Sequence, residues 1–131
     1  MIRVFTSKVL NEALTVEERK ALVADFKQYK VGKLPALFGK DVPYDHPFNL
    51  DIIKQEQVRH IHLAANGTGF PVLLTQMKRT SDTHLVYCLG FSNENCYLLM
   101  AILRPNAHDL AKSNQLMYQL GLMAQAFRQQ F

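Results

Sequence analysis

The sequence predicts an α+β protein in which N-terminal helices and a C-terminal helix pack on a small, twisted antiparallel sheet. Two patterns support this class. Between residues 58 and 103, short apolar or alternating segments are separated by turn-forming residues, which is typical of neighbouring strands. Residues 15–30 and 105–131 instead repeat apolar side chains at helical spacing. The chain has 131 residues, the length of one domain, and we assign residues 1–131 to a single domain.

The first predicted helix begins at a capping box. The Thr15 hydroxyl can accept from the free amide of Glu18, and the Glu18 carboxylate can accept from the amide of Thr15. Gly32 predicts the end of this helix. Further along the chain, residues 34–38 predict a short helical turn, and residues 40–57 predict an irregular loop that apolar side chains anchor to the core.

Five segments predict strands, and one of them carries two histidines. The segments are residues 2–7, 58–64, 71–77, 84–91 and 96–103. The last is apolar on both faces, which indicates an interior strand. In residues 58–64, alternation puts Ile61 and Leu63 on one face and His60 and His62 on the other. If the aliphatic pair faces the core, both imidazoles project from the opposite, functional face.

The C-terminal part predicts one helix that starts after Pro105 and runs to the end of the chain. Its predicted buried stripe comprises Leu110, Met117, Leu120, Ala124, Phe127 and Phe131. With Asn106 as N-cap, His108 falls in the first turn, where free amides and the positive end of the helix dipole attract phosphate. The same field favours the neutral imidazole of His108, which suits a general base.

The composition places the chain among globular proteins and indicates an anionic partner. The net charge is +4 and the sequence pI is about 9.2, a balance compatible with nucleic-acid binding. No segment has the length of a membrane span, and the first residues lack the apolar run of a signal peptide. We therefore expect a cytoplasmic protein without a membrane partner, with Cys88 and Cys96 as reduced thiols.

Histidines, cations and one aspartate gather on a few adjacent segments, mostly between residues 79 and 112. Cleavage of RNA by its own 2′-hydroxyl needs a base, an acid and cations for the charge on phosphorus, and imidazoles titrate near neutrality. The candidate acid–base residues are His60, His62, His84 and His108. The candidate phosphate ligands are Arg79, Arg104 and Lys112, with Asp82 as a residue that orients a histidine or another base.

A metal site is the competing interpretation of these histidines. His60 and His62 could reach one ion from alternate positions of a strand, and His84 or His108 could add a third nitrogen. However, the two-histidine motif alone is weak, no carboxylates cluster with it, and the cysteines are poorly spaced for ligation. We therefore predict no metal ligands and no small-molecule cofactor.

Several sequence motifs, in order along nearly the whole chain, resemble those of one bacterial family. They are MIRVF, LT-x-EE, LP-x-LFG-x-D, V-x-HIHLA, R-T-x-D followed by HLVYC, LL-x-AIL-x-P-x-x-H-x-LA, and the final AFR-x-x-F. On these motifs the chain resembles the YafO family of type II toxins. The resemblance implies a ribosome-dependent mRNA endonuclease that inhibits translation and is held inactive by a cognate antitoxin protein. Its partners would then be the antitoxin, the ribosome and mRNA.

More distantly, the order of strands resembles the RelE-type microbial ribonuclease fold, in which a basic sheet face accepts mRNA and no metal is needed. One strand of that superfamily often carries the sequence R-L-V-Y with a catalytic arginine, whereas this chain has His84-Leu85-Val86-Tyr87. Arg104 occupies the place of a second arginine after the last strand. Two alternatives stay open: a toxin of RelE or ParE fold that blocks another target without cleavage, or a non-catalytic RNA- or ribosome-binding module.

Overall fold

In the computed structural model, which describes residues 1–131, the centre of the molecule is a five-stranded mixed sheet. From edge to edge, its strands are β1 (Arg3–Thr6), β5 (Cys96–Leu103), β4 (His84–Leu89), β3 (Arg59–Leu63) and β2 (Phe38–Pro43). Strands β2, β3, β4 and β5 pair antiparallel, but β1 pairs with β5 in parallel. The α+β class is confirmed, whereas the expectation of a purely antiparallel sheet is wrong at the β1 edge.

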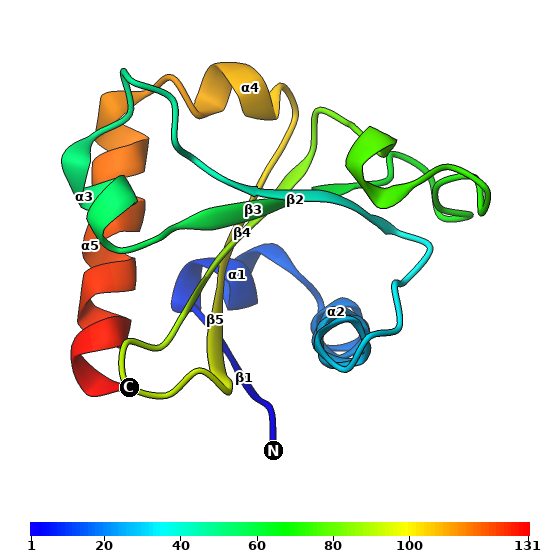
Figure 1. Ribbon diagram of the computed structural model, residues 1–131, viewed down its shortest axis with the longest axis horizontal. Coiled ribbons are helices and arrows are strands. Elements are labelled where there is room, and N and C mark those ends of the chain that lie inside the picture. The colour runs from blue at the N-terminus through cyan, green and yellow to red at the C-terminus, as the bar shows by residue number, and fades with distance from the viewer.

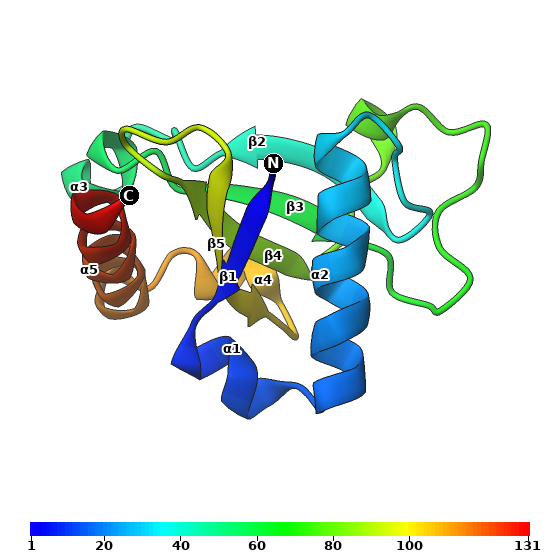
Figure 2. The same ribbon diagram turned by 90° about the horizontal axis from the view of Figure 1, so that it is seen from below.

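Helices cover both faces of this sheet. They are α1 (Lys8–Ala13), α2 (Val16–Lys30), α3 (Asp51–Gln55), α4 (Ala107–Leu110) and α5 (Asn114–Gln130), with a short 3-10 helix, η1 (Gln76–Lys78). Figure 1 shows α3 and α5 together at one side and α2, seen end-on, at the other. Figure 2 shows α2 lying across its face of the sheet. None of these helices is long and apolar enough to cross a membrane.

The sheet separates two apolar cores because successive side chains of a strand point to opposite faces. The core beneath α1 and α2 comprises Leu10, Phe26, Phe38, Ile61, Leu85, Tyr87 and Leu99. The core beneath α3 and α5 includes Val86, Cys88, Met100, Met117, Leu120, Ala124 and Phe127. Of the predicted stripe, Met117, Leu120, Ala124 and Phe127 are buried, whereas Leu110, on α4, and Phe131 are only partly buried. His60, His62 and His84 project on the α5 side of the sheet, opposite Ile61 and Leu85. Cys88 and Cys96 are buried free thiols.

The segment between β3 and β4 differs most from its prediction. Residues 71–77 form no strand, although they are apolar. Val72 and Leu73 are 87% and 97% exposed, and a tight turn closes where the amide of Leu74 donates to the Pro71 carbonyl at 3.0 Å. The segment instead extends beyond the end of the sheet, to the right in Figure 1. Its apolar side chains lack both a neighbouring strand and a core to cover.

Three other predicted elements also change. Residues 36–37 form a single turn and Phe38 already belongs to β2, so the predicted helical turn over 34–38 is wrong. Residues 40–57 contain the end of β2 and all of α3, so the predicted irregular loop is confirmed only over residues 44–50. Gly39 permits β2 because a Cβ atom at this position would overlap the carbonyl oxygen of Arg79. The C-terminal helix is divided into α4 and α5, and the Ser113 hydroxyl caps α5 by accepting from the Leu116 amide at 3.2 Å.

The start of α2 has the predicted capping box. The Thr15 hydroxyl accepts from the Glu18 amide at 3.1 Å, and the Glu18 carboxylate accepts from the Thr15 amide at 2.9 Å. Because Ala cannot cap, Thr15→Ala is expected to lower the free energy of unfolding by about 1 kcal/mol in urea denaturation. Thr75→Ala is the matched control, since Thr75 precedes η1 without a side-chain cap. Equal stability of the two variants would contradict the capping role.

Candidate active site

The pairing of β3 with β4 brings three histidines together on one face. His62 lies directly opposite His84, and His60 lies opposite Val86. The ring centroid of His84 is 4.4 Å from that of His60 and 4.5 Å from that of His62, and the His60 and His62 rings are 5.4 Å apart. Alternation along β3 puts His60 and His62 on the same face, and the register between β3 and β4 places His84 beside them. We call His60, His62 and His84 the histidine triplet.

The histidine triplet is buried at the end of the α5-side core. His60, His62 and His84 are 7%, 5% and 1% exposed. Burial is the main cause that lowers the pKa of His60 to about 3 and that of His84 to about 4, and the neighbouring imidazoles add to it. Burial also lowers the pKa of His62. The three rings are therefore neutral at pH 7, because burial disfavours their protonated forms.

Tyr44, immediately after β2, supports two rings of the triplet. Its ring stacks on His60 with centroids 3.9 Å apart and an interplanar angle of 18°, and its hydroxyl lies 3.1 Å from Nδ1 of His84. The sequence pattern does not single out Tyr44, because it lies in the stretch predicted as irregular loop. Only the pairing of Val42 with His60 shows that this aromatic ring must reach the histidines.

The nitrogens of the triplet differ in their hydrogen bonding. Nδ1 of His62 lies 2.8 Å from the Ser81 amide nitrogen and 2.9 Å from the Ser81 carbonyl oxygen, which fixes that ring. In contrast, Nδ1 of His60 and Nε2 of His84 are buried without any hydrogen-bond partner. Unpaired buried polar atoms are uncommon in folded proteins and often mark a functional site. Here both belong to imidazoles of the same cluster.

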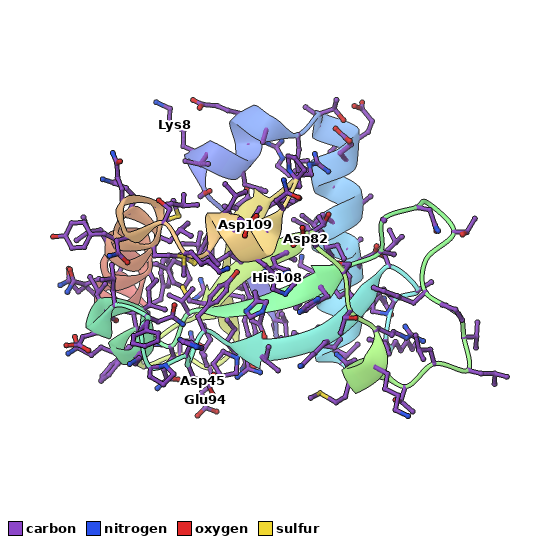
Figure 3. The ribbon with its side chains drawn as sticks, turned by 90° about the horizontal axis from the view of Figure 1, so that it is seen from above. Lys8, Asp45, Asp82, Glu94, His108 and Asp109 are labelled. Atoms are coloured by element: carbon purple, nitrogen blue, oxygen red, sulfur yellow. The ribbon has the colours of Figure 1, made fainter.

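A fourth histidine, His108 on α4, is held beside the triplet by Asp82. One carboxylate oxygen of Asp82 accepts from the backbone amide of His108 at 2.9 Å and from its ring Nδ1 at 2.7 Å. Figure 3 shows the two residues next to each other beside α4. The His108 and His84 ring centroids are 5.1 Å apart. With Nδ1 bonded to the carboxylate, Nε2 of His108 is the nitrogen available for proton transfer.

Asp82 also replaces the helix cap that the sequence predicted. Asn106 has a left-handed backbone with φ of 60° and makes no side-chain cap. The Asp82 backbone carbonyl accepts from the Ala107 amide at 3.0 Å, and the hydrogen bonds from His108 lower the pKa of the Asp82 carboxyl. A carboxylate therefore already occupies the start of α4, which has only four residues. The amides on which the predicted phosphate site at this helix start depends are therefore already bonded to Asp82.

A cavity of about 660 Å³ opens beside these histidines. Its wall includes Tyr44, Phe48, His60, His84, His108 and Lys112. Phe48 is 87% exposed and offers an uncovered aromatic ring at the rim. A cavity of this size can hold one nucleotide, and the combination of aromatic ring, imidazoles and one lysine matches the chemistry of a base and its phosphate. His62 lies behind His84 and does not line the cavity.

The two predicted arginines lie away from the cavity wall. Arg79 is only 6% exposed, and its guanidinium donates to the carbonyl oxygens of Leu74 and Phe38 at 2.9 and 3.2 Å. These bonds hold the segment between β3 and β4 against β2, so Arg79 has a structural role. Arg104 is exposed and lies toward the start of α2, where the hydrogen bonds from Thr15 are the main cause of the lowered pKa of Glu18 and the charge of Arg104 adds to them. Of the predicted cations, Lys112 alone lines the cavity.

Comparison with known proteins identifies the family. Residues 25–129 match the family described as "Toxin YafO, type II toxin-antitoxin system". The chain is also 49% identical, over 132 aligned residues, to a protein of Escherichia coli (strain K12) named mRNA interferase toxin YafO, with 99% of this chain and 100% of the relative covered. No solved structure matches, so the RelE-type fold stays an expectation. The match over most of the chain confirms the resemblance seen in the motifs, and the protein belongs to the YafO family of type II toxins.

Proposed function

We propose that this protein cuts ribosome-bound mRNA by metal-independent attack of a ribose 2′-hydroxyl on the adjacent phosphate, leaving a cyclic phosphate and a 5′-hydroxyl. The observation that carries the proposal is the cavity in which His60, His84 and His108 meet Lys112, with Asp82 orienting His108. This arrangement supplies proton acceptors, a proton donor and a cation within one nucleotide-sized space.

Family membership supports three parts of the proposal: the toxin class, the antitoxin partner and the endoribonuclease activity. The chain is a type II toxin, and type II toxins act with a cognate antitoxin. A relative that is 49% identical along its whole length is named an mRNA interferase, which supports endoribonuclease activity for this chain. Action on ribosome-bound message would take place in the cytoplasm. The positive net charge of +4 suits both RNA and an acidic antitoxin segment.

The proposed reaction uses two proton transfers. A neutral imidazole of His60 or His84 takes the proton from the 2′-hydroxyl as its oxygen bonds to phosphorus. The phosphate that enters the cavity brings negative charge, which favours a proton on these rings. His108 then gives a proton from Nε2 to the 5′-oxygen as the bond between phosphorus and that oxygen breaks. The Asp82 carboxylate supports this step because it stabilises the positive charge of the protonated His108 ring.

The other residues bind and position the RNA. Lys112 lines the cavity, and its ammonium can stabilise the negative charge that builds up on the phosphate oxygens. The exposed ring of Phe48 provides a stacking surface for a base, a sequence-tolerant contact common in proteins that bind single-stranded RNA. His62 supports His84 by packing against it, with its own ring fixed by Ser81.

The role of Lys112 can be tested against a second surface lysine. Lys112→Ala is expected to weaken RNA binding and to lower the slope of log affinity against log salt by about one, because one phosphate contact is lost. Lys8→Ala is the matched control: both lysines are exposed and both pair with a nearby carboxylate, but Lys8 lies on α1, far from His108 in Figure 3. Equal salt slopes for the two variants would contradict the proposed contact.

Primer extension separates the proposed function from its alternatives. Purified toxin is incubated with one mRNA, either naked or bound to initiated ribosomes, in buffer treated with a chelator. We expect cuts only on the ribosome-bound message. Cuts on naked RNA would contradict ribosome dependence. If cells that express the toxin stop growing but their mRNA shows no cuts, a toxin that blocks another target is favoured. If a variant without the four histidines still binds ribosomes, and neither it nor the parent cleaves mRNA, a non-catalytic binding module is favoured.

A further inference from the structure

The histidine triplet has a second chemical capability that proton transfer alone does not use. One ligand nitrogen from each of His60, His62 and His84 lies within 4.8 Å of the other two. The triplet also contains two buried nitrogens without partners, Nδ1 of His60 and Nε2 of His84. Three neutral imidazoles that converge in this way form a ligand set of the kind that holds Zn²⁺.

We propose that the triplet of His60, His62 and His84 is a binding site for a divalent transition-metal ion such as Zn²⁺, and that the bound ion inhibits the toxin. The inhibition rests on the proposed function, because the ion would occupy the lone pairs that accept the 2′-hydroxyl proton. The binding itself rests only on the geometry of the three rings.

Residues around the triplet contact its rings at positions where the partners of metal-ligating histidines are usually found. Ligating histidines usually hydrogen-bond through their second ring nitrogen, which fixes the ring and the tautomer. Nδ1 of His84 lies 3.1 Å from the Tyr44 hydroxyl. Nδ1 of His62 accepts from the Ser81 amide at 2.8 Å and also lies 2.9 Å from the Ser81 carbonyl oxygen. His84 can therefore direct Nε2 at an ion, whereas His62 must first release the proton that its Nε2 carries while Nδ1 accepts from the Ser81 amide. The stacked ring of Tyr44 holds His60 in place.

The chemistry of the set favours transition metals over hard cations. The three ligands are imidazoles, and no carboxylate belongs to the group. Mg²⁺ and Ca²⁺ prefer oxygen ligands, whereas Zn²⁺, Cu²⁺ and Ni²⁺ accept imidazole nitrogen. Nitrogens bound to one tetrahedral Zn²⁺ at about 2.1 Å lie about 3.4 Å apart, whereas these nitrogens lie within 4.8 Å of one another, so binding draws the rings together by at most about 1.4 Å. His60 and His84 also line the cavity, so water or a phosphate oxygen could reach the ion from there.

The binding test is a calorimetric titration of the full-length, chelator-treated toxin with Zn²⁺, and of variants. We expect one ion per chain, and His60→Gln, His62→Gln and His84→Gln are each expected to weaken binding at least about tenfold. His46→Gln is the matched control, because His46 is outside the triplet and should keep the parent's affinity. Circular dichroism checks that each variant is folded. No saturable binding, or equal affinity of the triplet variants and His46→Gln, would overturn the site.

Co²⁺ provides a second readout that does not depend on activity. In a tetrahedral site with nitrogen ligands, Co²⁺ gives a strong visible absorption, which octahedral Co²⁺ in water lacks. We expect this absorption with the parent toxin and its loss in His62→Gln. Absorption that persists in all three triplet variants would place the ion elsewhere and contradict the assignment.

The inhibition is measured separately on ribosome-bound mRNA. We expect one equivalent of Zn²⁺ to slow cleavage and a chelator to restore it. Unchanged cleavage by the loaded toxin would overturn the inhibitory role. If neither form cleaves RNA, the proposed function fails, while the titration still decides the metal site. If only the loaded toxin cleaves, the site is supported but both the inhibition and metal-independent catalysis are contradicted.

Discussion

His108→Ala is expected to slow mRNA cleavage by about 10²- to 10⁴-fold, the range typical for loss of a group that transfers a proton in the transition state. His108 lines the cavity, and Asp82 accepts from its Nδ1 at 2.7 Å, so the structure leaves its Nε2 for the RNA. The rate is measured by single-turnover cleavage of ribosome-bound message. In cells, the same variant should lose growth arrest.

Two further variants control for damage to α4. Asp109 follows His108 on the same short helix. Asp109→Ala removes an exposed carboxylate that pairs with the Lys112 ammonium at 3.7 Å. This variant is expected to keep the parent's cleavage rate. Asp82→Asn is expected to give an intermediate rate, because the amide can still accept from the His108 backbone but carries no charge. Full activity of a folded His108→Ala protein would contradict the assigned role.

Arg79→Met is expected to lower the free energy of unfolding by about 2–3 kcal/mol, because it leaves the buried Phe38 carbonyl and the partly buried Leu74 carbonyl without their donor. Arg79 is 6% exposed, and its bonds to the Leu74 and Phe38 carbonyls join the segment between β3 and β4 to β2. Met retains an apolar stem of similar length, so the loss reports mainly on hydrogen bonds. Urea denaturation measures the change.

Arg104→Met is the matched control for this prediction. Arg104 is exposed and its side chain makes no hydrogen bond or ion pair, so its replacement is expected to change stability by less than about 0.5 kcal/mol. The pair of variants also tests the phosphate role that the sequence suggested for both arginines. An Arg79→Met protein of unchanged stability but weaker RNA binding would contradict the structural role and restore the earlier interpretation.

The sequence predicts the regular elements well where periodicity is strong. The capping box of α2, the alternation of β3 and the apolar run of β5 are local signals, and each element forms as expected. Predictions fail where apolar residues have no local period. Residues 71–77 are apolar enough for a strand but lie exposed, and β2 exists only because Gly39 permits the close approach of the chain at Arg79. Such contacts depend on residues far apart in the sequence.

In the candidate site, too, the sequence predicts the features that depend on local pattern and misses those that depend on contacts between distant residues. Alternation in β3 predicts that His60 and His62 share a face, and the structure places them there. Their contact with His84 depends on the register between β3 and β4, which the residues of one strand do not determine. The Asp82–His108 pair spans 26 residues, and the Tyr44–His84 pair spans 40. The orienting role suggested for Asp82 has a matching hydrogen bond, whereas no sequence pattern pointed to Tyr44.

Chemical analysis of the cut RNA ends tests the central claim most directly. The toxin is treated with chelator, the ribosome-bound message is cut, and the fragments are examined for their terminal groups. Attack by the 2′-hydroxyl predicts a 2′,3′-cyclic phosphate on one fragment and a 5′-hydroxyl on the other, with no cleavage when the reacting ribose lacks its 2′-hydroxyl. A 5′-phosphate with a 3′-hydroxyl, or cutting of the deoxy-substituted message, would contradict the proposed chemistry.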